Sequence, residues 1–540
     1  MIVMLLVSLP LHAEPWADPA LDALSRQARD EWVDRFIGVG IRSPYASLLA
    51  PTGDLPPSVY ALYAPELSFR DDHEGLLWVV RPAADLSVGG MAPPYAGGDE
   101  EEGLLSTRVG AAATVIWGPW TARIRPEVGL GAVPGIAPVL QVQEAWTGLE
   151  MRGFTAGFGR TPRWVGPGRH GNLALTDNAV APWLGSVAGE GRPPGRARVL
   201  GRFRGELGIG LLGEPRSDVA NPGFLLLDLR WMPVPVVEIG ATRMAVFGGE
   251  GRPPADIGQL LLPTEPHIYG DPEQTLPDQD ELAALDFRVC LPIRRWTSLP
   301  IDHVEGWWEY GGEDVIGRKL GSVTYPALAG VGNLFGGEIA SGPAVITVEY
   351  ARLMDDYFRW YVGHRVYHDG FTQDDRSMGH AMGGDADDLW AAFTWTEDPW
   401  RVRVHGERMR RAGVIQAQGD HLFALSTEEQ RFGGGVDLGR RGRSGGMYSG
   451  AISLERVTGE AFVPGANGWN VRMAIAAAPF RAYSGRPGHP SAVPPPLPPP
   501  LLSPPSVPRP VPFPVAPPAP PRSEADRGTT EEPTRSGGDD

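Results

Sequence analysis

The chain has 540 residues, 42% of them hydrophobic, with a formal net charge of -17 and a single cysteine, Cys290. The acidic balance disfavours a nucleic-acid partner, and one cysteine excludes an intrachain disulfide or a cysteine-based metal cluster. The 71 glycines and 56 prolines argue against a mainly helical fold, and beyond the start no apolar run is long enough for a transmembrane helix.

The N-terminal region combines a short apolar start with one helical pattern. Residues 1–13, MIVMLLVSLPLHA, are mostly apolar and end in alanine, which predicts a signal peptide and export. Residues 14–54 form an N-terminal segment in which Asp18 and Pro19 fit the start of a helix and Gly38 fits its end. Between them, apolar residues recur at helical spacing: Leu21, Leu24, Ala28, Trp32 and Phe36.

Over residues 55–483 the hydrophobic period changes to two, which predicts strands. Charged residues of both signs alternate with apolar ones, and a tryptophan or tyrosine often closes the apolar face. The clearest runs are Gly201–Leu211, Leu225–Trp231, Asp286–Leu291, His303–Tyr310 and Arg401–Glu407. Alternating runs of about ten residues with aromatic ends are typical of outer-membrane barrels. Periodicity alone also leaves a soluble β-protein open.

Local motifs give no specific case for catalysis or for a metal site. Gly208–Gly213 matches GxGxxG, but Glu-Pro-Arg-Ser follows where a helix would start, so we expect a glycine-rich strand. His364 and His368 lack the glutamate of a zinc protease, and Phe358–Tyr367 alternates like a strand. The acidic run that begins at Asp385 lacks the spaced ligands of a calcium loop and predicts a solvated loop. We therefore expect no enzyme activity, no metal and no cofactor.

Residues 484–540 have the composition of an extended tail. Gly485–Arg522 is rich in proline and predicts a stiff polyproline II spacer. Ser523–Asp540 is acidic and polar, which predicts disorder.

Three strings, in order along the chain, resemble motifs of the Wzi-type capsule assembly proteins. RWVGPG at 163–168, followed by LALTDNA at 173–179, is similar to the family's RWWGPG and LxLSNNA element, with two substitutions. Glu238–Pro253 resembles a strand that leads into GGEGRP. A third string fits the pattern YxDGY followed by RSxGHxxxxD, through Tyr367, Asp369, Gly370, Arg376, Ser377, Gly379, His380 and Asp385.

The resemblance implies an all-β protein, a large antiparallel transmembrane β-barrel of about eighteen strands with a small helical element at its periplasmic end. It implies a non-catalytic outer-membrane lectin that binds exported capsular or other surface polysaccharide and helps attach it to the cell, without a cofactor. The expected partners are this polysaccharide, outer-membrane lipids and the barrel assembly machinery, and the expected state is a monomer.

The side chains expected to bind polysaccharide or to line the barrel come from these strings and from charged strand faces: Arg163, Trp164, Asn178, Arg202, Arg204, Arg252, Tyr367, Asp369, Arg376, His380, Asp385, Arg401 and Arg403. Arg376 and His380 are expected to pair with Asp369 and Asp385 in a loop. The alternative function is a diffusion channel for small solutes, with the arginines of the strands lining its pore.

Overall fold

The computed structural model describes residues 76–484 except 90–104, 118, 132–138, 152–153, 162, 177, 214–215, 235, 254–278, 321–322, 354–359, 363, 365, 374–375, 398, 419–420, 442–446, 460–463 and 479–481. The expected signal peptide, the expected N-terminal helix and the tail that follows Ser484 lie outside the described residues.

The first half of the described chain contains strands β1 Leu76–Gly89, β2 Leu105–Trp117, β3 Trp120–Gly131, β4 Val139–Met151, β5 Phe154–Arg160, β6 Trp183–Gly191, β7 Arg202–Leu211, β8 Gly223–Val234 and β9 Val237–Phe247, with the 3-10 helix η1 Gly195–Leu200. The second half contains β10 Gln279–Leu291, the helix α7 Ile293–Trp296, β11 His303–Leu320, β12 Val323–Ser341, β13 Ala344–Arg352, β14 Thr372–Gln373, β15 Arg376–Ser377, β16 Ala386–Glu397, β17 Trp400–Gln418, β18 His421–Arg441, β19 Met447–Thr458, β20 Asn467–Ala478 and β21 Ala482–Ser484.

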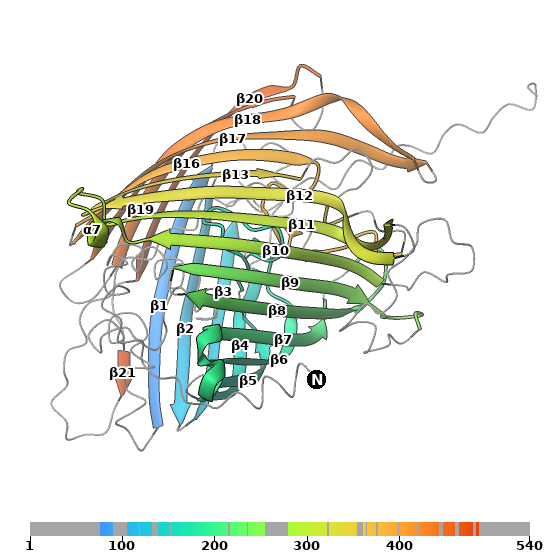
Figure 1. Ribbon diagram of the computed structural model, residues 1–540. Helices are drawn as coiled ribbons and strands as arrows, with labels where there is room; N and C mark the ends of the chain where they lie inside the picture. The colour runs from blue at the N-terminus through green and yellow to red at the C-terminus, as the bar shows by residue number, and fades with distance from the viewer. Residues whose placement is uncertain are drawn as a thin grey trace, which may run out of the picture.

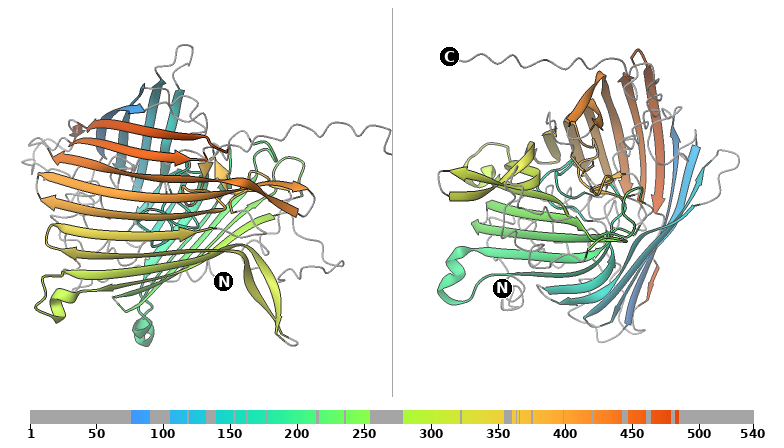
Figure 2. Two further views of the ribbon diagram at one scale, coloured as in Figure 1. Left: turned by 90° about the horizontal axis from the view of Figure 1, so that it is seen from above. Right: turned by 90° about the vertical axis from the view of Figure 1, so that its right-hand side faces the viewer.

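The long strands form a ring of antiparallel neighbours. Each of β1–β12 pairs with the next strand, β13 pairs with β16, and the order continues through β20. β20 then pairs with β1 over Ala84–Gly89, and β21 pairs with β1 beyond it, so the pairing returns to its start. The strands wrap around a common interior (Figure 1 and Figure 2). The prediction of a large antiparallel barrel is confirmed.

The wall is charged inside and apolar outside. On β11, Glu305 and Glu309 are 2% and 1% exposed, whereas the intervening outward residue Trp308 is 42% exposed. The same alternation places Phe335 of β12 and Ile346 of β13 on the outside. A soluble sandwich would bury these apolar side chains, whereas a barrel in lipid exposes them around its circumference. The alternating runs read from the sequence therefore lie in strands with their charged faces inward.

The two ends of the barrel differ in the length of their connections. At one end, turns such as those between β8 and β9 or between β12 and β13 contain two residues. At the other end, connections run through residues 161–182, 212–222, 248–278 and 353–385. We call these the short-turn end and the long-loop end. β1 begins and β20 finishes at the short-turn end, because the pairing is antiparallel and the ring holds an even number of strands.

Two local expectations have different outcomes. Gly208–Gly213 begins within β7, as predicted for a glycine-rich strand, and Cys290 is a buried thiol on β10. The strand expected at Phe358–Tyr367 is wrong in the described part of that range, where residues 360–362, 364, 366 and 367 form no strand. Instead His364 Nδ1 accepts from the backbone N–H groups of Val366 and Tyr367, which turns the chain.

In the part of the chain that the structure describes, no helix has the length and hydropathy of a membrane span.

We expect the folded protein to be heat-modifiable on gels. Closed pairing satisfies the backbone hydrogen bonds within the wall, so detergent alone does not unfold such a barrel. Samples loaded with and without boiling should migrate differently. A single band position under both conditions, with recovery in the soluble fraction, contradicts the expectation.

Candidate functional site: loops inside the barrel

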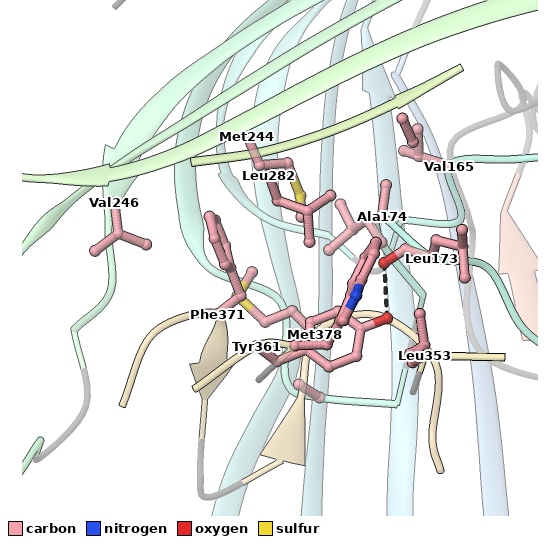
Figure 3. Packing of buried hydrophobic residues seen from close by; sticks show 14 of the residues in the cluster. Val165, Leu173, Ala174, Met244, Val246, Leu282, Leu353, Tyr361, Phe371 and Met378 are labelled. Carbon is pink, nitrogen blue, oxygen red and sulfur yellow. Dashed lines mark hydrogen bonds between the residues drawn. The ribbon is translucent and has the colours of Figure 1, made fainter. Parts of the chain in front are cut away.

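Two long-loop-end connections fold into the barrel and meet there. Residues 161–182 connect β5 to β6, and residues 353–385 connect β13 to β16. We call these two segments the plug. Their origins lie nearly half the ring of strands apart, so the plug crosses the interior. Both contribute to one apolar cluster with inward side chains of the wall (Figure 3), including Leu173, Leu353, Tyr361, Phe371, Met244 and Leu282.

Hydrogen bonds join the two plug segments directly. Thr176 N donates to Met378 O at 2.7 Å, and Asn178 Nδ2 donates to Ser377 O at 2.9 Å. The hydroxyl of Tyr361 donates to Leu173 O at 2.7 Å and accepts from His380 N at 2.9 Å. Burial raises the pKa of Tyr361 well above its usual range, so the phenol stays protonated and keeps its donor.

Carboxylates on the wall hold the backbone of residues 161–182. Glu349 of β13 accepts from the N–H groups of Arg169 (2.6 Å), His170 (3.0 Å) and Gly171 (2.7 Å), and from Trp307 Nε1 (3.0 Å). One carboxylate therefore accepts from four donors that would otherwise lack a partner inside the barrel.

Strand β11 fixes the same segment from a second side. Glu309 of β11 accepts from Leu173 N at 2.8 Å and from Ala174 N at 3.3 Å. Arg169 Nη2 donates to Glu305 at 2.6 Å, and its guanidinium lies 5.2 Å from the centre of the Trp307 ring. The inward charges of the strands therefore act as anchors for the plug.

The wall also carries ion pairs among its own strands. Arg230 of β8 is fully buried and bonds Asp228 at 2.9 Å and Asp286 of β10 at 2.6 Å. Arg204 of β7 lies 3.3 Å from Glu206 and 3.7 Å from Asp228. These contacts tie β7, β8 and β10 together across the inner face.

The GGEGRP string meets the plug at the long-loop end. Tyr367 Oη donates to Gly248 O at 2.9 Å, and Glu250 N donates to Ala220 O at 3.0 Å. Gly248, Gly249 and Gly251 have φ angles of 60°, 97° and 75°, a left-handed conformation that glycine tolerates and that turns the chain after β9. All three family-like strings therefore converge on one end of the barrel.

Polar side chains of three loops gather on the surface of this region. Asp369 accepts from the N–H and the hydroxyl of Ser217, each at 2.7 Å, and Asn221 Nδ2 donates to Glu250 at 3.1 Å. We call Ser217, Asn221, Glu250, Arg252 and Asp369 the mouth patch; all are exposed or half-buried.

A buried ion pair underlies the mouth patch. Arg216 bonds Asp218 and donates to the carbonyl oxygens of Gly370 and Thr372, which joins the 212–222 connection to the plug. Burial opposes ionisation of Asp218, but hydrogen bonds from Arg216 and backbone N–H groups outweigh it and lower the pKa of this carboxyl.

A histidine–carboxylate group lies where the plug meets β16 and β17. His170 Nε2 is 3.1 Å from Asp388 Oδ2 and 3.7 Å from Glu407 Oε1. Burial opposes the charged imidazolium, but these two carboxylates outweigh burial and raise the pKa of His170 to about 10. Burial and the nearby His170 lower the pKa of His380 to about 3, so the His380 ring is neutral.

The structure places the expected site residues in three groups. Arg163, Trp164, Asn178, Tyr367, Asp369, Arg376, His380 and Asp385 belong to the plug, and Arg202, Arg204, Arg401 and Arg403 belong to the inner wall; Arg252 belongs to the mouth patch. Arg163 bonds Glu206 of the wall at 2.9 Å, and Trp164 Nε1 donates to Gly168 O at 2.9 Å. Arg202 bonds Glu190, and Arg403 bonds Asp437 at 2.8 Å.

Two expectations for the third string are wrong. Asp369 bonds Ser217 rather than Arg376, and His380 faces Asp388 at 3.9 Å rather than pairing with Asp385. The acidic run is not a solvated loop, because Asp385, Asp387 and Asp388 are buried and the last two lie in β16. The physical reason is the apolar set around them, including Phe371, Met378 and Met382, which draws the segment into the interior.

A comparison with family models identifies the chain. The model described as "Capsule assembly protein Wzi" matches residues 98–442. The chain belongs to this family. No curated protein matches the chain.

Solved structures with a similar fold include the Escherichia coli Wzi protein. It has a TM-score of 0.57 and 16% identity over 84% of this chain and 98% of its own, and it is described as an outer-membrane protein involved in group 1 capsule assembly and as a carbohydrate-binding β-barrel. Pseudomonas aeruginosa OccK5 (TM-score 0.44, 7% identity, 76% of this chain and 99% of its own) and OprD (TM-score 0.42, 7% identity, 76% and 95%) also match. The likeness to Wzi supports the barrel fold of this Wzi-family chain.

Proposed function

We propose that this Wzi-family chain is a non-catalytic outer-membrane barrel that binds exported surface polysaccharide and helps attach it to the cell. The observation that carries the proposal is the mouth patch, a polar surface built by three loops over a hydrogen-bonded plug. Family membership and the stated carbohydrate binding of the E. coli protein supply the ligand class.

The connections support one orientation in the membrane. Outer-membrane barrels have short turns on the periplasmic side and long loops outside the cell. The long-loop end, with the plug and the mouth patch, therefore faces outward, where exported polysaccharide arrives. In this proposal, lipids contact the apolar outer face and the barrel assembly machinery inserts the chain. The protein acts as a monomer.

The mouth patch has the chemistry that a polysaccharide requires. Sugar hydroxyl groups both donate and accept hydrogen bonds, and the patch offers amide, carboxylate, hydroxyl and guanidinium groups within a few ångströms. Pairs such as Asn221–Glu250 and Ser217–Asp369 already hold these groups in place. Such preorganisation reduces the entropy lost when a chain of sugars binds.

Glu250→Ala and Asn221→Ala should each weaken binding of the surface polysaccharide by about tenfold, the loss that follows when hydrogen bonds to a charged group disappear. Binding is measured with the purified protein in detergent and polysaccharide from the producing cells, and shed polysaccharide is measured in culture. The matched control is Glu397→Ala, an exposed glutamate at the short-turn end. Wild-type affinity in both mouth variants, or an equal loss in the control, would place the polysaccharide elsewhere.

A diffusion channel would conduct ions steadily across a planar bilayer, whereas a plugged barrel would not. Since the plug crosses the interior and is anchored by Glu349 and Glu309, we expect no steady conductance from the wild-type protein in planar bilayers. A persistent open current, reproduced after purification from other barrels, would support the channel and contradict the binding barrel.

A further inference from the structure

The histidine–carboxylate group described above joins three separate parts of the chain. His170 comes from the plug, Asp388 from β16 and Glu407 from β17. One ligand atom of each, an imidazole nitrogen and two carboxylate oxygens, lies within 4.8 Å of the others. This spacing allows three side chains to coordinate one ion after small shifts.

The group has polar atoms without hydrogen-bond partners. Both oxygens of Asp388 and the Nε2 of His170 are buried and form no hydrogen bond, since the 3.1 Å approach between the two residues is not aligned as one. Asp388 is 2% exposed. Unsatisfied buried groups of this kind call for an explanation, and an ion coordinated by both side chains supplies one.

A second histidine–carboxylate group shows why the first is the better candidate. His303, Glu305 and Glu338 also lie close together, but Arg288 bonds Glu305 at 2.5 Å and Arg169 bonds it at 2.6 Å. Guanidinium groups therefore already neutralise that cluster. Within the part of the chain that the structure describes, the ion-pair partners of Asp388 and Glu407 are histidines, His170 and His380, rather than arginines.

We propose that His170, Asp388 and Glu407 bind one divalent transition-metal ion of the zinc type, which fastens the plug to the wall. Three protein ligands of nitrogen and oxygen, with a remaining position for water, are the donor set of open zinc sites. A purely oxygen-seeking ion such as calcium would not select the imidazole.

The surroundings position the ligands and leave a route to them. Trp390 stacks on the His170 ring at 5.0 Å between centres, and Glu349 accepts from His170 N. A Cβ at Gly171 would lie 2.1 Å from the His380 ring, so glycine permits His380 to approach. The Glu407 side chain is 25% exposed, which opens one side of the site to an incoming ion. No sequence motif reveals this set of ligands, because the three residues are far apart along the chain.

The test uses untagged full-length protein in detergent, stripped with a chelator and titrated with Co²⁺, whose absorption reports the ligands. We expect one Co²⁺ to bind per chain and Zn²⁺ to displace it. The bound ion should also raise the temperature at which the folded band disappears on gels. His170→Gln and Asp388→Asn should weaken binding by more than about 100-fold, beyond the effect of altering an outer-sphere residue. Glu407→Gln, which is partly exposed, serves if either of these fails to fold.

His368→Gln is the matched control, because His368 is exposed and outside the proposed site. It should bind Co²⁺ as the wild type does. The proposal is overturned if the wild type retains no ion, if the three ligand variants bind as tightly as the wild type, or if His368→Gln abolishes binding. In those cases His170 is only an ion-pair partner of the two carboxylates, or the ion sits at the surface.

Discussion

Glu349→Ala is expected to destabilise the barrel more than any other single carboxylate change considered, by roughly 4 kcal/mol or more, since each buried donor left unpaired costs about 1–3 kcal/mol. Three backbone N–H groups, those of Arg169, His170 and Gly171, and Trp307 Nε1 lose their shared acceptor. The measurement is the temperature at which the folded band disappears on unboiled gels, which should fall well below that of the wild type.

Glu397→Ala again provides the matched control, because this glutamate is exposed at a short turn. Its unfolding temperature should equal that of the wild type. Equal temperatures for all three proteins would show that water satisfies the plug backbone when Glu349 is absent, and the anchoring role would be wrong.

Arg230→Met should lower the free energy of unfolding by about 3–5 kcal/mol, the range for removing one partner of a buried ion pair. The methionine fills much of the volume, but Asp228, Asp286 and Glu238 then lose the cation that they share, and Asp228 keeps only the more distant Arg204. Arg294→Met is the control for burial: Arg294 bonds Asp302 at 2.7 Å, but its side chain is 70% exposed. Exposed pairs contribute about 0–1 kcal/mol, so this variant should resemble the wild type.

A second substitution separates lost attraction from stranded charge. Adding Asp286→Asn to Arg230→Met removes one of the facing carboxylates and should restore part of the stability. If the double variant is less stable than Arg230→Met alone, the loss does not arise from repulsion among the remaining carboxylates.

The sequence was most informative where one rule acts locally. Alternation of period two depends only on neighbouring residues, so the strands and their charged faces, such as Arg204 with Glu206 in β7, were predicted. The three family-like strings also marked the region where the plug and the mouth patch lie. A period of two does not show whether water or lipid contacts each face of the sheet. In the structure Trp308 points outward and the neighbouring Glu309 is buried inside, which is the arrangement of a barrel whose outer face contacts lipid.

The side-chain contacts of the site could not be predicted from the sequence, because they join residues that are far apart along the chain. Asp369 was predicted to pair with Arg376 because the two are close in sequence. In the structure the Asp369 carboxylate accepts a hydrogen bond from Ser217 instead. The acidic run at Asp385 was predicted to be solvated because charged side chains usually face water. The apolar residues of the plug instead bring this run into the interior. Glu349 gave no local signal at all, since its four donors come from other segments.

The plug also constrains the order in which the molecule is assembled. Gly171 N bonds Glu349 across a sequence separation of 178 residues, and Tyr361 bonds Leu173 across 188. The N–H groups of residues 169–171 and the carbonyl of Leu173 therefore lack these partners until β13 and the segment after it have been added to the growing sheet. Contacts of such high sequence separation form late, because the intervening chain must first lose its freedom. Closure of the long-loop end is thus a late event in biogenesis, and a chain arrested before β13 would lack a closed plug.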